Sequence, residues 1–295
     1  MDQLMHKLFN GVEMPVMCLG PGVIKQNEHI FNSDIVENLN DLWNEYKITK
    51  VISNAPLIGC NCFDTSSAYG KCEEVLGRAL KSKAREEIFI TTKISNLDQR
   101  NKKVKDALNE SMIRLGVNYI DLYLMHWPQK GKYLETWKQM EELYDTGAIK
   151  AIGVCNFHIQ HFEELFNVAA IKPMVHQFEL HPLFTQFEMS KFCNEENIQI
   201  MAYTPTGRGD DRLKNNHFLQ RAALRHHKSI IQVILRWHFQ KGNIPIMRTN
   251  SIEHLKENMN IFDFLLSDKE MKRIDSININ SRLRYDSNNC EFDRL

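Results

Sequence analysis

The sequence predicts a single (β/α)8 barrel, which is a closed sheet of eight parallel strands surrounded by helices. Three observations predict this fold. Short apolar segments alternate with amphipathic segments along nearly the whole chain. Most apolar segments end in a polar residue, and successive ends lie between 21 residues (Asn156 to Gln177) and 45 residues (Tyr203 to Arg248) apart, a spacing that suits one strand, loop and helix. Eight such units fit into 295 residues.

The first expected element is a β-hairpin that precedes the barrel. Residues 7–16 (KLFNGVEMPV) place Asn10-Gly11 between two short segments that can pair. Asn-Gly is a preferred dipeptide of tight hairpin turns, because both positions need a left-handed backbone. We expect this hairpin to close the bottom of the barrel.

The eight expected strands follow in chain order. Because parallel neighbours cannot be joined by tight turns, the helical segments between these strands indicate a parallel sheet. The strand segments are 17–20 (MCLG), 63–66 (FDTS), 88–94 (IFITTKI), 119–128 (YIDLYLMHWP), 151–157 (AIGVCNF), 174–180 (MVHQFEL), 198–205 (IQIMAYTP) and 244–248 (IPIMR).

Helices are expected between these strands, and two of them are especially clear. In residues 102–116, apolar and small residues recur at helical spacing and Gly116 provides a left-handed end; in the next unit the pattern leads to Gly147. The two predicted buried faces are Val104, Ala107, Leu108, Ser111, Met112 and Leu115, and then Leu134, Trp137, Met140, Leu143 and Tyr144.

The main alternative fold is a doubly wound nucleotide-binding sheet. That fold has a G-x-G-x-x-G turn after its first strand, whereas this chain has only GPG at 20–22 and GRG at 207–209, neither of which completes the pattern. We also find no linker or low-complexity tract. The prediction is therefore one domain spanning residues 1–295.

Composition limits the class of partner and the compartment. Lysine plus arginine equals aspartate plus glutamate at 37 each, so no net charge attracts nucleic acid or anionic membranes, and a small-molecule partner is expected. No apolar run approaches the roughly 18–20 residues of a membrane span, and residues 1–10 lack the apolar core of a signal peptide. We expect a cytoplasmic protein.

Cysteine and histidine spacing gives no sign of a metal site. The seven cysteines include no CxxC pair, so neither a zinc ribbon nor a disulfide framework is indicated, and most are expected to be buried. The histidine pairs at 158 and 161 and at 226 and 227 lack a third ligand at zinc spacing and are expected on helix surfaces. A metal-dependent hydrolase on this fold is therefore the weakest alternative.

Four chemically active residues lie at or just after strand ends: Asp64, Tyr69, Lys93 and His126. In a (β/α)8 barrel these ends meet on one face, where active sites form. A tyrosine phenol has an ordinary pKa of about 10, and we expect the Lys93 ammonium to lower it while Asp64 holds the lysine. His126, directly before Trp127, is expected to orient a carbonyl oxygen toward the phenol.

This set contains an acid but no evident covalent nucleophile, so a hydride from a cofactor is the natural complement. With FDTSSAYG, IFITTKI, RLGVNYIDLYLMHWP, GAIKAIGVCNF, MVHQFELHP, IQIMAYTP and LKENMNIFDFLLS in this order, the chain resembles the aldo-keto reductase superfamily. The resemblance runs from NGVEMPV to about residue 278. It implies an NADPH-dependent reduction of aldehydes or ketones in which Tyr69 donates the proton, and a monomer.

The resemblance also implies a cofactor site. Asn156 and Gln177 would bind the nicotinamide carboxamide, Tyr203 would stack on its ring, and Cys155 stands where the family usually has serine. Arg248 and Thr249 would bind the adenosine 2′-phosphate, together with His254 in place of the usual arginine. Glu257 and Asn258 would contact the adenine, and His126 and Trp127 the substrate.

Several features leave alternatives open. Each signal taken alone fits an ordinary turn, a surface charge or a packed side chain, and Cys155 fits either a packed or a redox-sensitive thiol. The segment from Gly20 to Gly59 is longer than the family's usual one, and LGPGV lacks its usual tryptophan. A regulatory or structural protein that binds the cofactor with little turnover is the alternative function. Sugars, keto acids and bulky ketones all remain candidate substrates.

Overall fold

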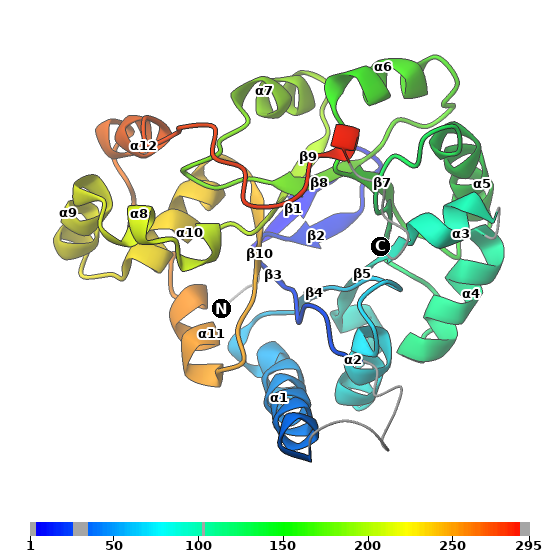
Figure 1. Ribbon diagram of the computed structural model, residues 1–295, viewed down its shortest axis with the longest axis horizontal. Coiled ribbons are helices and arrows are strands. Elements are labelled where there is room, and N and C mark those ends of the chain that lie inside the picture. Colours follow the sequence, from blue (N-terminus) through cyan, green and yellow to red (C-terminus); the bar gives the residue numbers. More distant parts are fainter. Residues whose placement is uncertain (1–3, 26–34, 102–103, 290–295) are drawn as a thin grey trace.

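A computed structural model describes residues 4–25, 35–101 and 104–289 of the chain, with side chains except those of 35–39 and 289. Eight strands pair in parallel and close into a barrel in the order β10-β3-β4-β5-β6-β7-β8-β9, with helices around the outside (Figure 1). The predicted fold is confirmed. The strands are β3 (Cys18–Leu19), β4 (Cys62–Asp64), β5 (Phe89–Ile94), β6 (Leu122–Met125), β7 (Ile152–Cys155), β8 (Val175–Glu179), β9 (Gln199–Tyr203) and β10 (Ile244–Met247).

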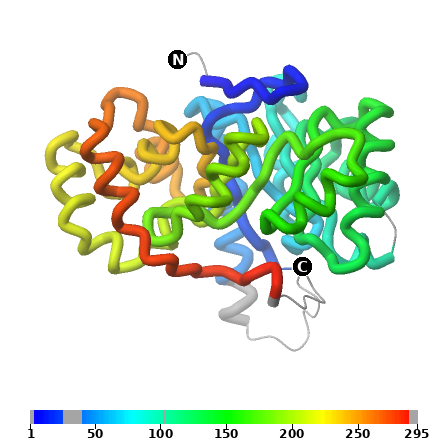
Figure 2. The backbone as a smooth tube through the Cα atoms, turned by 90° about the horizontal axis from the view of Figure 1, so that it is seen from above, coloured from blue at the N-terminus to red at the C-terminus, as the bar shows by residue number. Residues whose placement is uncertain are grey.

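The predicted N-terminal hairpin is present. Strands β1 (Met5–Lys7) and β2 (Glu13–Pro15) pair antiparallel, and Gly11 takes φ +90° in the turn, where a left-handed residue is needed. The Asn10 side chain donates to the carbonyl of Lys150, just before β7 begins, so the hairpin lies at the amino ends of the strands. Figure 2 shows it at the opposite end of the barrel from the C-terminal segment.

The helices follow the predicted alternation. The predicted face of α4 is buried at Val104, Ala107, Leu108, Ser111 and Leu115, with Met112 partly buried against the core. The helices are α1 (Ile35–Asn54), α2 (Cys72–Leu80), α3 (Asn96–Arg100), α4 (Val104–Leu115), α5 (Tyr133–Asp145), α6 (Ile159–Phe166), α7 (Phe187–Glu195), α8 (Asp211–Lys214), α9 (His217–His226), α10 (Ile230–Gln240), α11 (Ile252–Met259) and α12 (Asp268–Asp275), and the 3-10 turns are η1 (Ala55–Ile58), η2 (Arg85–Glu87), η3 (Gly207–Gly209) and η4 (Ser287–Asn289).

Two strand ends differ from the prediction. Gln177, expected to end its strand, lies in the middle of β8, because Phe178 and Glu179 continue the pairing with Ala202 and Tyr203 of β9. Strand β6 covers only residues 122–125 of the expected 119–128, so His126 lies just past its carboxyl end. The carboxyl ends therefore carry Glu179 in addition to the residues that the spacing identified.

Buried polar groups lie among the apolar side chains of the barrel. Strand β5 is buried along its whole length although it contains Thr91, Thr92 and Lys93. Lys93 is fully buried, and a buried charge is stable only when it is paired and hydrogen-bonded. The partners of this lysine lie at the carboxyl ends of the strands.

Candidate active site

The buried lysine forms an ion pair at the carboxyl end of the barrel. Lys93 Nζ donates to Oδ1 and Oδ2 of Asp64 at 2.8 Å each and to the carbonyl of Thr65 at 2.8 Å. Burial lowers the pKa of Lys93, but the surrounding groups, led by the Asp64 carboxylate, together raise it by more, so the net pKa is raised. The lysine is therefore a fixed ammonium at neutral pH.

Tyr69 lies in the turn between β4 and α2, and a second loop holds this turn in place. Ile24 donates its N–H to the Tyr69 carbonyl and accepts the N–H of Lys71, so the segment after β3 pairs with the turn. The Tyr69 hydroxyl lies 3.4 Å from Nε2 of His126, and Lys93 Nζ lies 5.2 Å from the centre of the Tyr69 ring. The structure thus brings Asp64, Tyr69, Lys93 and His126 together, as the sequence predicts.

The expected lowering of the tyrosine pKa is wrong for this structure. Burial raises the pKa of Tyr69 to about 12; the Lys93 ammonium lowers it and the Asp64 carboxylate raises it again. The three donors of Lys93 are used by Asp64 and Thr65, so the ammonium acts on the phenol only through its partly compensated charge. Tyr69 therefore keeps its proton throughout the neutral range.

His126 is a neutral imidazole held by a residue that the sequence analysis missed. Burial and the Lys93 charge hold the pKa of His126 well below its ordinary value. Its Nδ1 lies 3.2 Å from Ser66 Oγ, and that oxygen already accepts the N–H of Ala68 at 3.2 Å. We assign the Ser66 proton to Nδ1, which leaves Nε2 protonated and directed at the Tyr69 hydroxyl.

Asn156, Gln177 and Tyr203 are connected to this group by hydrogen bonds. Asn156 donates to the His126 carbonyl at 3.0 Å and accepts the Tyr203 hydroxyl at 2.7 Å, while Gln177 donates to Asp64 at 2.7 Å. Asn156 takes a left-handed φ of +60° directly after β7, a conformation that residues other than glycine adopt at a cost. One N–H and one lone pair of its amide are used by these two contacts, which leaves a second N–H and a second lone pair for a ligand.

Cys155 lies deeper than the family resemblance implies. Its side chain is fully buried and is not among the residues that line the cavity at this site, and burial raises the pKa of its thiol well above the ordinary value. A buried, protonated thiol is unreactive, which argues against the redox-sensitive alternative. The six cysteines within the described residues are all buried and unpaired, as expected.

The residues expected to bind the adenosine part of the cofactor lie together, after β10 and on α11. Arg248 and Thr249 follow β10, and His254, Glu257 and Asn258 come from α11. Arg248 packs against Gly22, which takes φ +79°; a Cβ atom there would lie 2.8 Å from Arg248 Nε. The GPG turn thus leaves room for the guanidinium.

One cavity of about 780 Å³ joins both ends of the site. Every predicted site residue except Lys93 and Cys155 lines it, so three members of the tetrad of Asp64, Tyr69, Lys93 and His126 share one continuous space with the cationic residue Arg248. This donor set fits a dinucleotide, since Arg248 can hold a phosphate and the amides of Asn156 and Gln177 lie next to the tetrad. The predicted lining residues are Asp64, Tyr69, His126, Trp127, Asn156, Gln177, Tyr203, Arg248, Thr249, His254, Glu257 and Asn258.

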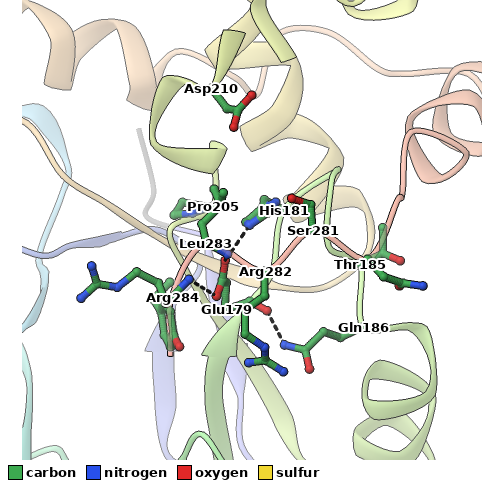
Figure 3. A network of polar contacts seen from close by, with 12 residues as sticks. Glu179, His181, Thr185, Gln186, Pro205, Asp210, Ser281, Arg282, Leu283 and Arg284 are labelled. Carbon is green, nitrogen blue, oxygen red and sulfur yellow. Dashed lines mark hydrogen bonds and ion pairs between the residues drawn. The ribbon is translucent and has the colours of Figure 1, made fainter. Parts of the chain in front are cut away.

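The residues that line the cavity without having been predicted include Arg208, Arg284 and Tyr285. Arg208 is the centre of GRG, and Arg284 and Tyr285 belong to a C-terminal segment without helical or strand periodicity. The buried Glu179 at the end of β8 anchors this segment by accepting the backbone N–H groups of Leu283 at 2.7 Å and Arg284 at 2.9 Å (Figure 3). In the sequence, Glu179, just before LHP, was the one available sign that a polar anchor lies here.

The histidine pairs differ in part from expectation. His158 caps the start of α6 and lies 3.0 Å from Asp286 of the C-terminal segment, whereas His226 contacts Glu270 of α12. Across the residues for which the structure gives side chains, no three His, Cys, Asp or Glu groups could hold a metal ion together. None of the helices described here combines the length and apolar character that a membrane crossing requires.

Comparisons with known proteins agree with this fold and identify the family. Residues 38–279 match the model of the Aldo/keto reductase family. The glyoxal reductase of Bacillus subtilis is 42% identical over 279 residues, 94% of each chain. The structure of MGS-M4, an aldo-keto reductase from a Medee basin deep-sea metagenome library, aligns with a TM-score of 0.87 at 34% identity over 97% of this chain and 100% of the other. A Bombyx mori aldo-keto reductase in complex with NADP aligns at 0.82 and 29% identity over 98% and 97%.

Proposed function

Since this chain belongs to the aldo/keto reductase family, we propose that it reduces small aldehydes or ketones to alcohols with NADPH. The observation that carries the proposal is the contact among Asp64, Lys93, Tyr69 and His126 at one end of a cavity that also holds a cationic end. The relatives named as glyoxal reductase and as an NADP complex support the substrate class and the cofactor.

Specific residues would hold the cofactor. Arg248 and Thr249 would take the adenosine phosphate, Asn156 and Gln177 the carboxamide, and Tyr203 would lie against the nicotinamide ring. When bound, NADPH supplies the hydride that the protein side chains lack. A substrate carbonyl would then lie between the Tyr69 hydroxyl and the side chains proposed to hold the nicotinamide, Asn156, Gln177 and Tyr203.

The tetrad positions the carbonyl oxygen and moves one proton. The protonated Nε2 of His126 donates to that oxygen, and the Tyr69 hydroxyl beside it gives up its proton as negative charge develops. A raised pKa is compatible with this step, because an alkoxide is about as basic as hydroxide and therefore far more basic than a phenolate. A phenol with a pKa of about 12 therefore protonates the alkoxide favourably.

The ion pair stabilises the state that follows proton transfer. The phenolate left on Tyr69 faces the Lys93 ammonium, whose position is fixed by Asp64 and Thr65. Because this ammonium is already in place, no solvent reorganisation is needed when the charge appears. Asp64 in turn accepts from Gln177, which links proton transfer to the proposed nicotinamide contact.

We also propose that the chain is a single-domain monomer in the cytoplasm. Closure of the barrel supports the monomer, because its eight strands have no open edge with which a second copy could pair. Light scattering of the purified chain tests the monomer: one mass matching 34.6 kDa is expected, and a stable multiple of that mass would contradict it.

The direct test is turnover with purified protein. NADPH absorbance is followed with glyoxal, methylglyoxal and a panel of neutral aldehydes and ketones, and NADPH affinity is measured separately by fluorescence. We expect turnover of at least one dicarbonyl, and tighter binding of NADPH than of NADH because Arg248 holds the 2′-phosphate. Binding of NADPH without turnover of any carbonyl would indicate the regulatory alternative instead.

A further inference from the structure

The C-terminal segment 281–287 lies across the carboxyl ends of the barrel strands, where it runs from α12 past β8 and β9 toward β7 (Figure 1). Its main anchor is Glu179, which is fully buried. The Glu179 carboxylate accepts the N–H groups of Leu283 and Arg284 on separate oxygens and also contacts His181 Nε2 at 2.9 Å (Figure 3). A buried carboxylate is costly without such partners, so the attachment is specific.

Contacts on both sides of this anchor fix the segment along its length. Ser281 donates its N–H to the Leu183 carbonyl at 3.0 Å, and Ser287 donates its hydroxyl to the carbonyl of Asn156. Asp286 is held between Arg282, at 3.2 Å, and His158. The segment therefore belongs to the framework of the site, and its last contact reaches a proposed cofactor residue.

The consequence is a positioned arginine in the wall of the cavity. Because its backbone N–H is held by Glu179, the Arg284 side chain points away from that carboxylate (Figure 3) and lines the same cavity as Tyr69, His126 and Trp127. Its neighbour Arg282 is paired with Asp286. Arg284 differs: within the described part of the chain, its guanidinium has the Tyr285 ring, at 5.6 Å, and no carboxylate partner.

The carboxylates that line this cavity do not neutralise the positive charge of the Arg284 guanidinium. Asp64 is committed to Lys93 on both oxygens, and Glu257 belongs to α11 at the adenosine end. A guanidinium offers a planar fork of N–H donors that matches a carboxylate or phosphate with two parallel hydrogen bonds. The cavity that Tyr69 lines therefore also has a cation, Arg284, without a carboxylate partner in the described part of the chain.

We infer that Arg284 binds an anionic group of the substrate, so that this enzyme prefers small carbonyl compounds carrying a carboxylate or phosphate. The inference rests on the proposed carbonyl reductase function and narrows its substrate class. The Tyr285 ring, next to the guanidinium, and the Trp127 indole provide apolar surface for the short carbon chain between the two polar groups.

The test compares carbonyl pairs in which one member carries an anionic group and the other has a neutral group in its place. The carboxylate pair is succinic semialdehyde against butanal, and the phosphate pair is glyceraldehyde 3-phosphate against glyceraldehyde. For wild-type enzyme with saturating NADPH, we expect kcat/KM to favour the anionic member of at least one pair by about tenfold, mainly through KM; tenfold corresponds to ~1.4 kcal/mol. The pair with the larger preference shows whether the recognised anion is a carboxylate or a phosphate. Added salt should reduce this preference.

Substitution of Arg284 tests whether this residue causes the preference for anionic substrates. Arg284→Gln should bring the anionic-to-neutral ratio of kcat/KM close to one, while Arg221→Gln, an equal charge change on the exposed surface of α9 outside this cavity, should leave the ratio unchanged. Absence of any preference in the wild type, or a preference that persists in Arg284→Gln, would overturn the inference.

A binding measurement separates failure of this inference from failure of the proposed function. Calorimetry with 4-hydroxybutyrate and n-butanol, in the presence of NADPH, needs no turnover. We expect 4-hydroxybutyrate to bind wild-type protein at least about tenfold more tightly than it binds Arg284→Gln. If both proteins bind it equally, the inference is wrong; if binding depends on Arg284 but no carbonyl is reduced, only the proposed reaction is wrong.

Discussion

At the residue scale, the least expected observation is a fully buried lysine in an apolar barrel. Its ammonium is stable there only because Asp64 and the Thr65 carbonyl take all three of its protons. The same arrangement prevents it from donating to Tyr69. Lys93 therefore acts as a fixed charge beneath the phenol, which matches a role in stabilising the phenolate after the proton has left.

Removing the countercharge should destabilise the fold. Asp64→Asn leaves the Lys93 ammonium buried without an anion, and we expect a loss of about 3 kcal/mol in the free energy of unfolding. Urea denaturation followed by circular dichroism measures it. Glu195→Gln is the control, because the exposed pair of Glu195 with Lys191 should contribute less than about 0.5 kcal/mol. A loss below about 1 kcal/mol for Asp64→Asn would contradict the account.

The pH dependence follows from the shifted groups. The acid form of Tyr69 is lost only as pH rises toward about 12, and His126, whose pKa is lowered, stays neutral through the mildly acidic range. Under saturating NADPH, kcat/KM for a neutral aldehyde should therefore be flat from about pH 6 to about pH 9. An alkaline decline with an apparent pKa near 8 would show that the Lys93 charge dominates burial.

The sequence predicted which residues meet but not how their environment changes them. Asp64, Tyr69, Lys93 and His126 were found from their positions at strand ends, because parallel strands bring those ends together. The direction of the Tyr69 shift was wrong, since burial and the compensation of Lys93 by Asp64 depend on packing that spacing does not record. Ser66 was missed for the same reason: nothing in FDTSSAYG indicates which serine reaches the histidine ring.

At the element scale, loops rather than strands give the site its individual form. The segment after β3 supports the Tyr69 turn through Ile24 and makes room for Arg248 through Gly22. Strand β8 runs past Gln177 to Glu179, where it anchors the C-terminal segment. Alternation of apolar and amphipathic segments predicted the strands and helices. The C-terminal segment has no such periodicity, so its position could not be predicted from the sequence, although it lines the cavity.

A substitution in the GPG turn separates backbone strain from cofactor binding. Gly22→Ala forces a left-handed alanine and places its Cβ 2.8 Å from Arg248 Nε, so it should cost about 1 kcal/mol of stability and weaken NADPH binding about tenfold. Gly59→Ala is the matched control: Gly59 has φ +84° with nothing within 4 Å of the added atom. It should lose similar stability and keep its NADPH affinity, as fluorescence titration will measure. Equal NADPH affinity for both variants would show that Arg248 does not hold the cofactor.

At the scale of the whole molecule, the two ends of the barrel have different tasks. The hairpin β1-β2 packs at the amino ends, where it contributes Leu8 and Met14 to the buried core, and the C-terminal segment lies at the opposite end of the barrel (Figure 2). Arg284 and Tyr285 of that segment line the cavity. The barrel between them brings groups far apart in sequence, such as Tyr69 and Arg284, to one space. The predicted fold accounts for this division, because barrel enzymes carry chemistry at the carboxyl ends of their strands and stability at the other end.

The central claim is that the Tyr69 hydroxyl donates the proton in an NADPH-dependent carbonyl reduction. The measurement that tests it most directly is kcat for Tyr69→Phe with a dicarbonyl substrate, alongside its NADPH dissociation constant. We predict a loss of at least about a hundredfold in kcat, as expected for removal of a general acid, with NADPH affinity changed less than about threefold. A variant that keeps most of its kcat while binding NADPH normally would contradict the account.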